Sequence, residues 1–143
     1  MSNFQEDLKK WREYEEKVKK KLVKEFWVIF DSNPDCKGVD LINELLSVEV
    51  KYDTRVGKDS KNVFLEISCS WEESGIFAYD SDYFIIGWDE SFIIIKLQKL
   101  QELVMDWIIK GKYDIKKAWD WYRVRWLAVD YLELSKEGKL IQL

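Results

Sequence analysis

The sequence predicts an α/β fold with a central mixed β-sheet flanked by helices. Apolar residues recur every three or four positions near the start of the chain and again after residue 96, which is the helical period. Between these two segments, short apolar runs are bounded by polar and turn-forming residues, as strands usually are. A chain of 143 residues can bury one hydrophobic core, so we expect a single domain over residues 1–143.

An amphipathic helix is expected over residues 4–26. Its apolar stripe consists of Phe4, Leu8, Trp11, Val18, Leu22 and Phe26. Glu15 occupies the gap in this stripe, so its carboxylate is aimed at the core side of the helix. Burying a carboxylate costs free energy unless it finds a partner. On spacing alone, Glu15 either faces the core with such a partner or lies at the helix edge and reaches solvent.

The middle of the chain is expected to form strands. The predicted segments are a short strand continuing the helix within 26–30, a hairpin of 39–42 and 45–52, a strand over 63–68 pairing with the hairpin, a short strand near 74–77, and strands over 83–88 and 92–96. In the hairpin, Val48 and Val50 alternate with Glu49 and Lys51. Because strand side chains alternate between faces, Glu49 and Lys51 should point to the same face.

The last third of the chain is expected to begin with a second amphipathic helix. Its apolar face would comprise Leu97, Leu100, Leu103, Val104, Trp107 and Ile108, and the helix should end near Gly111. Residues 114–126 resemble a further, less regular helix. The stretch from residue 127 onwards indicates a strand, a turn and a short closing strand.

The composition excludes several classes of chemistry. The chain has no histidine and only two cysteines, Cys36 and Cys69, which argues against a disulfide scaffold and a Cys/His zinc site. Without histidine there is no histidine-based catalytic triad, so any catalysis must use carboxylates, lysine or a metal ion. The N-terminus lacks an apolar signal, and no run approaches the roughly 18 apolar residues that span a bilayer. We therefore expect a cytoplasmic protein with no membrane partner.

The charges are unevenly distributed along the chain. The net charge of −4 argues mildly against nucleic-acid binding. However, residues 62–95 contain seven acidic and no basic residues, whereas residues 1–27 carry eight basic and six acidic residues, and residues 96–126 carry eight basic and four acidic ones. Basic surfaces that contact DNA are thus compatible with the acidic total.

Three residues of the predicted hairpin form a candidate catalytic group. Asp40 opens the first strand, and Glu49 and Lys51 lie on the second, so pairing of the two strands could bring the acids together. Two neighbouring carboxylates repel each other unless a hard cation lies between them, and Mg²⁺ prefers oxygen ligands. The ion could activate a water molecule, while Lys51 could stabilise charge on a phosphate. Alternating charge on the exposed face of a sheet is the alternative explanation for Glu49 and Lys51.

These residues resemble the motif of the PD-(D/E)xK nuclease superfamily. The matching segments are GVD at 38–40 and VEVKYD at 48–53, although Val39 stands where the name-giving motif has proline. The resemblance implies a restriction-endonuclease-like core, in which a helix, a hairpin and a third strand are followed by a helix and a strand. It also implies that Asp40 and Glu49 bind metal, that the Val50 carbonyl is a third ligand, and that Lys51 is the catalytic lysine.

Over residues 11–68 the pattern is similar to archaeal-type Holliday junction resolvases, in which a glutamate of the first helix joins the active site. Glu15 takes that place here. Segments NVFLE at 62–66, SGI at 74–76 and SDY at 81–83 are more similar to small phage nucleases, which would place the protein in the host cytoplasm. Glu66 either extends the acidic site or faces water.

The resemblance implies a Mg²⁺-dependent, structure-selective DNA endonuclease that resolves four-way junctions, with Mn²⁺ able to substitute. Such an enzyme is expected to be a homodimer, because a four-way junction has two-fold symmetry. Trp119, Trp121, Tyr122 and Trp126 could form its interface or complete the monomer core. The alternatives are a general or restriction-like nuclease or exonuclease, and a non-catalytic DNA-binding accessory protein. Candidate DNA contacts are Lys19, Lys20, Arg55 and Lys58, although charge runs on a helix are usually solvated.

Overall fold

The computed structural model describes residues 2–33, 39–53, 56, 61–69, 72–73, 75–117 and 124–143. The helices are α1 (Ser2–Phe26), the 3₁₀ helix η1 (Gly75–Phe77), α2 (Leu97–Lys110) and α3 (Tyr131–Ser135). The strands are β1 (Asp31–Ser32), β2 (Leu41–Ile42), β3 (Ser47–Tyr52), β4 (Asn62–Cys69), β5 (Glu72–Glu73), β6 (Tyr83–Trp88), β7 (Ser91–Lys96), β8 (Lys116–Lys117), β9 (Arg125–Asp130) and β10 (Lys139–Gln142).

The described strands form two sheets. The larger sheet has the order β1-β2-β3-β6-β7-β10, and it is mixed because β3 and β6 are parallel while the other neighbours are antiparallel. The second sheet, β5-β4-β9-β8, is antiparallel. The predicted α/β class with a mixed central sheet and flanking helices is confirmed.

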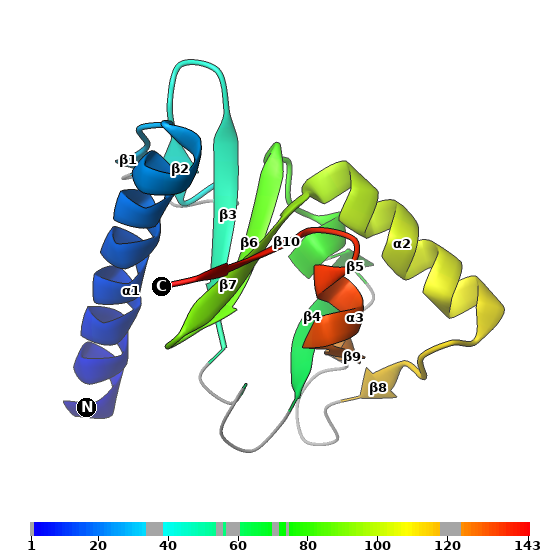
Figure 1. Cartoon of the computed structure of the whole chain (residues 1–143). Helices are drawn as coiled ribbons and strands as arrows, with labels where there is room; N and C mark the ends of the chain where they lie inside the picture. The colour runs from blue at the N-terminus through cyan, green and yellow to red at the C-terminus, as the bar shows by residue number, and fades with distance from the viewer. Residues whose placement is uncertain are drawn as a thin grey trace.

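The larger sheet lies between two layers. Figure 1 shows α1 on one side of it, and β4, β9 and α2 on the other. Each side has its own apolar core, because side chains of a strand alternate between faces. Val48, Val50, Ile85 and Phe92 pack on the α1 side with Tyr14, Val18 and Leu22. Phe84, Ile86, Ile93 and Ile95 pack on the other side with Val63, Leu65, Leu100, Val104 and Leu127.

Helix α1 confirms the predicted amphipathic helix, although Leu8 and Phe26 of the predicted apolar stripe are exposed. Val18 and Leu22 are buried, and so is Tyr14, whose hydroxyl donates a hydrogen bond to the Ser91 carbonyl at 3.1 Å. The helix ends at Phe26, where Trp27 adopts a left-handed backbone with φ of 60°. This reversal prevents the predicted strand within 26–30, and the first strand is instead β1.

The predicted hairpin is confirmed, although its first strand is short. β2 pairs antiparallel with β3, with Leu41 opposite Val48. Asn43 replaces the glycine that tight turns often use: its side-chain oxygen accepts hydrogen bonds from the amides of Leu45 and Leu46 at 2.9 and 2.7 Å. The turn therefore fixes the register that carries Glu49 and Lys51.

Two predictions about the following segment are wrong. The strand predicted over 63–68 exists as β4, but it pairs with β5 and β9 and not with β3, whose edge is taken by β6. Packing explains the exchange, because Val63 and Leu65 cover the buried face of the larger sheet from a second layer. The segment predicted as a strand near 74–77 forms η1 in its described part, residues 75–77.

Helix α2 confirms the second amphipathic helix, and Gly111 caps it with a left-handed backbone at φ of 68°. The helix predicted over 114–126 is wrong in its described parts, where β8 and the start of β9 are strands; residues 118–123 lie outside the described residues. β9 and β10 confirm the predicted final strands. Between them the sequence prediction missed α3, which Asp130 caps by accepting a hydrogen bond from the Leu132 amide at 2.8 Å.

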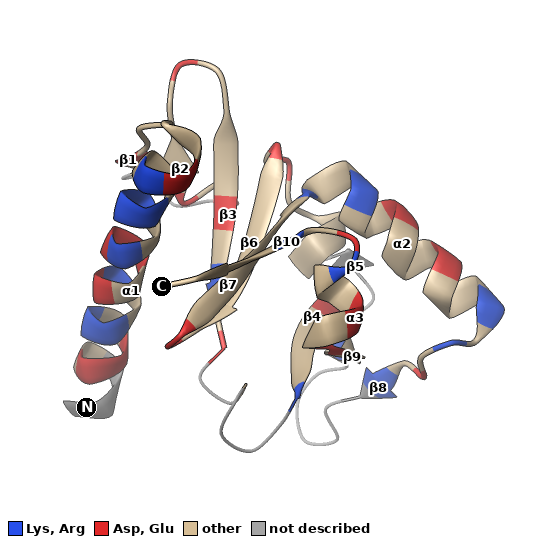
Figure 2. Ribbon diagram, in the orientation of Figure 1, with Lys and Arg blue, Asp and Glu red and all other residues tan. Residues whose placement is uncertain are grey.

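Charged residues lie mainly along the helices and loops, whereas the ribbons of β6 and β7 are largely uncharged (Figure 2). Among the described helices, none has both the length and the apolar character needed to cross a membrane.

Candidate functional site

Glu49 and Lys51 lie on the same face of β3, as the period of two predicts. Val48 and Val50 point to α1, so the alternate residues point to the side of the second sheet. On that side Glu49 is next to Phe84 of β6, and Lys51 is next to Ile86. The two charged side chains thus border the apolar layer between the sheets.

Asp40 is fixed against β3 by two hydrogen bonds. Its backbone amide donates to the Val48 carbonyl at 2.9 Å, and its Oδ2 accepts from the Val50 amide at 2.8 Å. In an extended strand the amide and carbonyl of one residue face the same edge, so the Val50 carbonyl also faces the edge where Asp40 lies. The structure therefore brings Asp40 and Glu49 together, as pairing of the two strands predicted, and places both beside the Val50 backbone.

The Asp40 and Glu49 carboxylates are both buried, with exposed fractions of only 7% and 5%. Burial raises the pKa of Glu49 to about 7, and the nearby charge of Asp40 adds to this effect while Lys51 opposes it. Burial also raises the pKa of Asp40, against the stabilising hydrogen bond from the Val50 amide. Glu49 Oε2 is buried without a hydrogen-bond partner. The pair thus holds negative charge at a free-energy cost that a cation would offset.

Lys51 extends from this pair toward solvent. Its Nζ lies 3.4 Å from Glu49 Oε1, and 46% of its side chain is exposed. The same Nζ lies 5.0 Å from the centre of the Tyr79 ring. Burial lowers the pKa of Lys51, but hydrogen bonding to Tyr79 and the charge of Glu49 outweigh it and raise the pKa above its usual value. Lys51 is therefore a fully protonated cation held between a carboxylate and a phenol.

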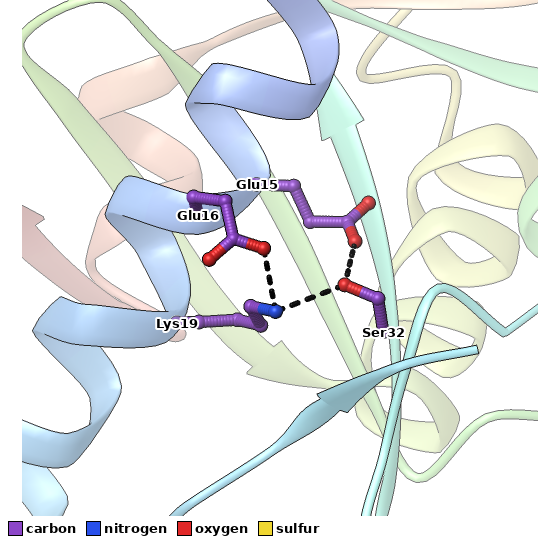
Figure 3. Close-up of polar contacts among 4 residues, drawn as sticks. All are labelled: Glu15, Glu16, Lys19 and Ser32. Atoms are coloured by element: carbon purple, nitrogen blue, oxygen red, sulfur yellow. Dashed lines mark hydrogen bonds and ion pairs between the residues drawn. The ribbon is translucent and has the colours of Figure 1, made fainter. Parts of the chain in front are cut away.

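Glu15 is buried, which decides between the two positions that its spacing allowed. Only 6% of it is exposed, and its Oε1 accepts a hydrogen bond from the Ser32 hydroxyl at 2.7 Å (Figure 3). Burial raises its pKa, Ser32 partly offsets that effect, and the charge of Asp40 raises the pKa further. Glu15 Oε2 is buried without a hydrogen-bond partner. Glu15 is thus a buried carboxylate on the helix side of the sheet, and its pKa responds to the charge of Asp40.

The candidate DNA contacts differ in their surroundings. Lys19 donates to the Ser32 hydroxyl at 3.0 Å and pairs with Glu16 Oε1 at 2.6 Å, so it belongs to the network around Glu15 (Figure 3). Lys20 is exposed on α1. Arg55 and Lys58 lie outside the described residues.

A cleft of about 350 Å³ opens beside Lys51, between the larger sheet and the second sheet. We call it the Lys51 cleft. It is lined by Lys51, Tyr52, Asp53, Phe64, Leu65, Glu66, Gly75, Ile76, Tyr79, Phe84 and Ile86. Glu66 is exposed, as the solvent-facing alternative required, yet it also borders this cleft. Sequence reasoning missed Tyr79, which comes from the segment after η1.

The donor set fits a Mg²⁺ ion that retains part of its water shell. Among the described residues, no three Asp, Glu or Cys side chains are placed to hold one metal ion. Mg²⁺ commonly binds through one or two carboxylates and completes its octahedron with water and substrate phosphate. Asp40, Glu49 and the Val50 carbonyl supply such a partial set, and the unpartnered Glu49 Oε2 is available to it.

Comparison with protein-family models, with curated proteins and with solved structures found no match to this chain.

The raised pKa of Glu49 predicts how stability depends on pH when no divalent ion is present. A carboxyl that binds its proton more tightly in the native state stabilises the fold below its ordinary pKa of 4.5, and this stabilisation is lost as the pH rises through about 7. Glu49→Gln, which is neutral at every pH, should weaken this loss and unfold at a higher temperature than wild type at pH 8.

Thermal unfolding in EDTA between pH 5 and pH 8 measures this difference. Glu102→Gln, on the exposed face of α2, is the control and should retain the wild-type dependence. Identical pH dependence in wild type and Glu49→Gln would show that Glu49 does not retain a proton in the native state.

Proposed function

We propose that this protein is a metal-dependent DNA endonuclease with a restriction-endonuclease-like core. The observation that carries the proposal is the buried pair of Asp40 and Glu49, with the exposed ammonium group of Lys51 beside it. Buried carboxylates with raised pKa values in contact with a lysine are costly for stability, and such arrangements concentrate at functional sites. The order of helix, hairpin and Glu-x-Lys strand also agrees with the resemblance to the PD-(D/E)xK superfamily.

Asp40, Glu49 and the Val50 carbonyl would hold the metal. A bound Mg²⁺ or Mn²⁺ lowers the pKa of a water ligand and polarises a phosphoryl oxygen, which is the chemistry that phosphodiester hydrolysis requires. Lys51 would bind a non-bridging phosphate oxygen and stabilise the negative charge that develops in the transition state. Its contact with Glu49 orients it for this role. Glu15, from α1, would act on the site in two ways. Its charge interacts with that of Asp40, and its hydrogen bond from the Ser32 hydroxyl holds β1 against the helix.

The proposed substrate is branched DNA, with the four-way junction as the first candidate. A chain with 23 basic and 27 acidic residues has little capacity for strong sequence-independent attraction to duplex DNA. Recognition would therefore depend on the shape and strand separation of the DNA near the site. A homodimer would match the two-fold symmetry of a junction.

The aromatic interface considered for this dimer is only partly described. Trp126 packs edge-to-face on Phe64 with ring centres 4.6 Å apart, so it contributes to packing within the second sheet. Trp119, Trp121 and Tyr122 lie outside the described residues.

Cleavage of a labelled four-way junction beside a matched linear duplex tests the proposal. We expect Mg²⁺-dependent cuts that EDTA abolishes, and paired symmetric cuts on the junction alone if the protein is a resolvase. Cutting of both substrates would support a general nuclease. No cleavage with Mg²⁺ or Mn²⁺ would contradict the proposal and favour a non-catalytic DNA-binding protein.

A further inference from the structure

We propose that the Lys51 cleft is a base-binding subsite that receives the unstacked base of the nucleotide next to the cut phosphate. The inference rests on the proposed nuclease function, because it assumes that a phosphodiester is held at Asp40, Glu49 and Lys51. It goes further by naming the part of the substrate that fills the cleft.

The size and position of the cleft suit a single base. Its 350 Å³ lies at the lower end of the range for small-ligand pockets, so it has room for one planar group. Lys51 lines the cleft and also contacts Glu49, which joins the cleft to the carboxylate pair. A strand whose phosphate lies at Lys51 can therefore direct its neighbouring base between the two sheets.

Two aromatic residues from different elements line this space, Tyr79 after η1 and Phe64 of β4. Phe64 of β4 is held by its edge-to-face contact with Trp126, and Tyr79 stacks on Phe84 with ring centres 6.1 Å apart and an interplanar angle of 21°. Both side chains are half-buried, so each retains some accessible surface. Bases stack on such rings with little regard to sequence. Rings already fixed by neighbours lose little conformational entropy on binding.

Gly75 allows η1, and with it the segment that carries Tyr79, to approach β4. Gly75 has φ of +58°, and a Cβ at this position would lie 2.1 Å from the Glu66 carbonyl oxygen. Only glycine therefore permits η1 to pack directly on β4. The Gly75 carbonyl also accepts a hydrogen bond from the Tyr79 amide at 3.2 Å, which positions Tyr79 at the cleft.

The charges along the cleft favour a base over a phosphate. Burial raises the pKa of Tyr79, Lys51 opposes this effect, and the charges of Glu49 and Glu66 add to it; Glu66 lines the same cleft as Tyr79. A carboxylate repels phosphate but accepts hydrogen bonds from the amino groups of cytosine and adenine. Among the described residues that line the cleft, Lys51 supplies the one cation, and it lies at the end next to Glu49. Phosphate is thereby favoured at that end and a base with an amino group farther in.

A subsite of this kind selects DNA whose bases are already unpaired. Moving a base out of a stack costs least where the strand is single or branched. The cleft thus provides a physical reason for cutting beside a branch point rather than within a continuous duplex.

Binding of a short fluorescein-labelled single strand of mixed sequence tests this inference, with Ca²⁺ present in place of Mg²⁺. The strand is compared with versions that carry an abasic site at each successive position. We expect one position at which loss of the base weakens binding about tenfold, from the usual contribution of base stacking on an aromatic ring. Tyr79→Leu should remove this position-specific loss, whereas Tyr79→Phe, which retains the ring, should preserve it.

Phe26→Leu is the matched control, because Phe26 lines a different cavity, and thermal unfolding verifies that each variant is folded. Equal binding of all abasic strands by wild type would overturn the base-binding subsite. So would a Tyr79→Leu variant that retains the position-specific loss. If Mg²⁺-dependent junction cleavage nevertheless occurs, the proposed function survives without the subsite. A position-specific loss without any cleavage would support the subsite and contradict the nuclease. Failure of the wild-type protein to bind both the single strand and the four-way junction would contradict the subsite and the nuclease function alike.

Discussion

Alanine in place of Glu49 or Lys51 is expected to abolish DNA cleavage while the protein remains folded. Glu49→Ala removes a metal ligand, and Lys51→Ala removes the cation that stabilises charge on the phosphate. Removing one preorganised group that stabilises a transition state commonly costs about a hundredfold to a thousandfold in rate. The fold should tolerate both changes, because Glu49 is a destabilising buried charge and Lys51 is half-exposed.

Initial rates on the four-way junction at saturating Mg²⁺ measure this effect, and DNA binding in Ca²⁺ should fall far less than the cleavage rate. Glu102→Ala and Lys110→Ala remove the same charges from α2 and should cleave normally. Cleavage by either site variant at the wild-type rate would show that the chemistry occurs elsewhere.

Gly87→Ala is expected to destabilise the fold strongly. Gly87 lies in β6, where a Cβ would stand 1.7 Å from the Tyr14 hydroxyl oxygen, 2.7 Å from Phe92 Cβ and 2.8 Å from the Ser91 carbonyl oxygen. Relieving these contacts requires the Tyr14 side chain to move, which breaks its buried hydrogen bond to the Ser91 carbonyl. Overpacking together with an unsatisfied buried polar group should lower the free energy of unfolding by about 3 kcal/mol or more.

Urea or thermal unfolding measures this change. Gly111→Ala is the control: a Cβ there meets nothing within 4 Å, so only its left-handed backbone, at φ of 68°, should cost about 1 kcal/mol. Adding Tyr14→Phe to Gly87→Ala should recover only part of the loss, since the contacts with Phe92 and Ser91 remain. Equal losses for Gly87→Ala and Gly111→Ala would contradict the close packing of α1 on β6.

Elements whose signals are local could be predicted from the sequence. Helices α1 and α2 follow from apolar spacing, and β3 follows from the alternation of Val48 and Val50 with Glu49 and Lys51. The partner of β4 could not be predicted, because alternation identifies a buried face but not the strand that lies beside it. The positive φ of Trp27 could not be predicted either, since a bulky residue rarely adopts such a backbone conformation.

The candidate site shows the same division. The sequence was sufficient to predict Asp40, Glu49 and Lys51 as site residues. A hairpin joins residues that are close in the chain, and its register fixes the face on which each side chain lies. Tyr79 was missed because it meets Lys51 only after β4 and η1 form a second layer. Gly75, in the SGI segment at 74–76, was the available signal, because its positive φ allows η1 to approach β4.

Crystals of the wild-type protein soaked in Mn²⁺, with anomalous scattering measured at the manganese edge, would locate a bound ion directly. We expect one strong peak in contact with the carboxylates of Asp40 and Glu49, on the edge of β3 that the Val50 carbonyl faces, and no such peak in Asp40→Asn crystals. Absence of a peak between Asp40 and Glu49 at saturating Mn²⁺, or a peak that persists unchanged in Asp40→Asn, would contradict a metal centre at this carboxylate pair.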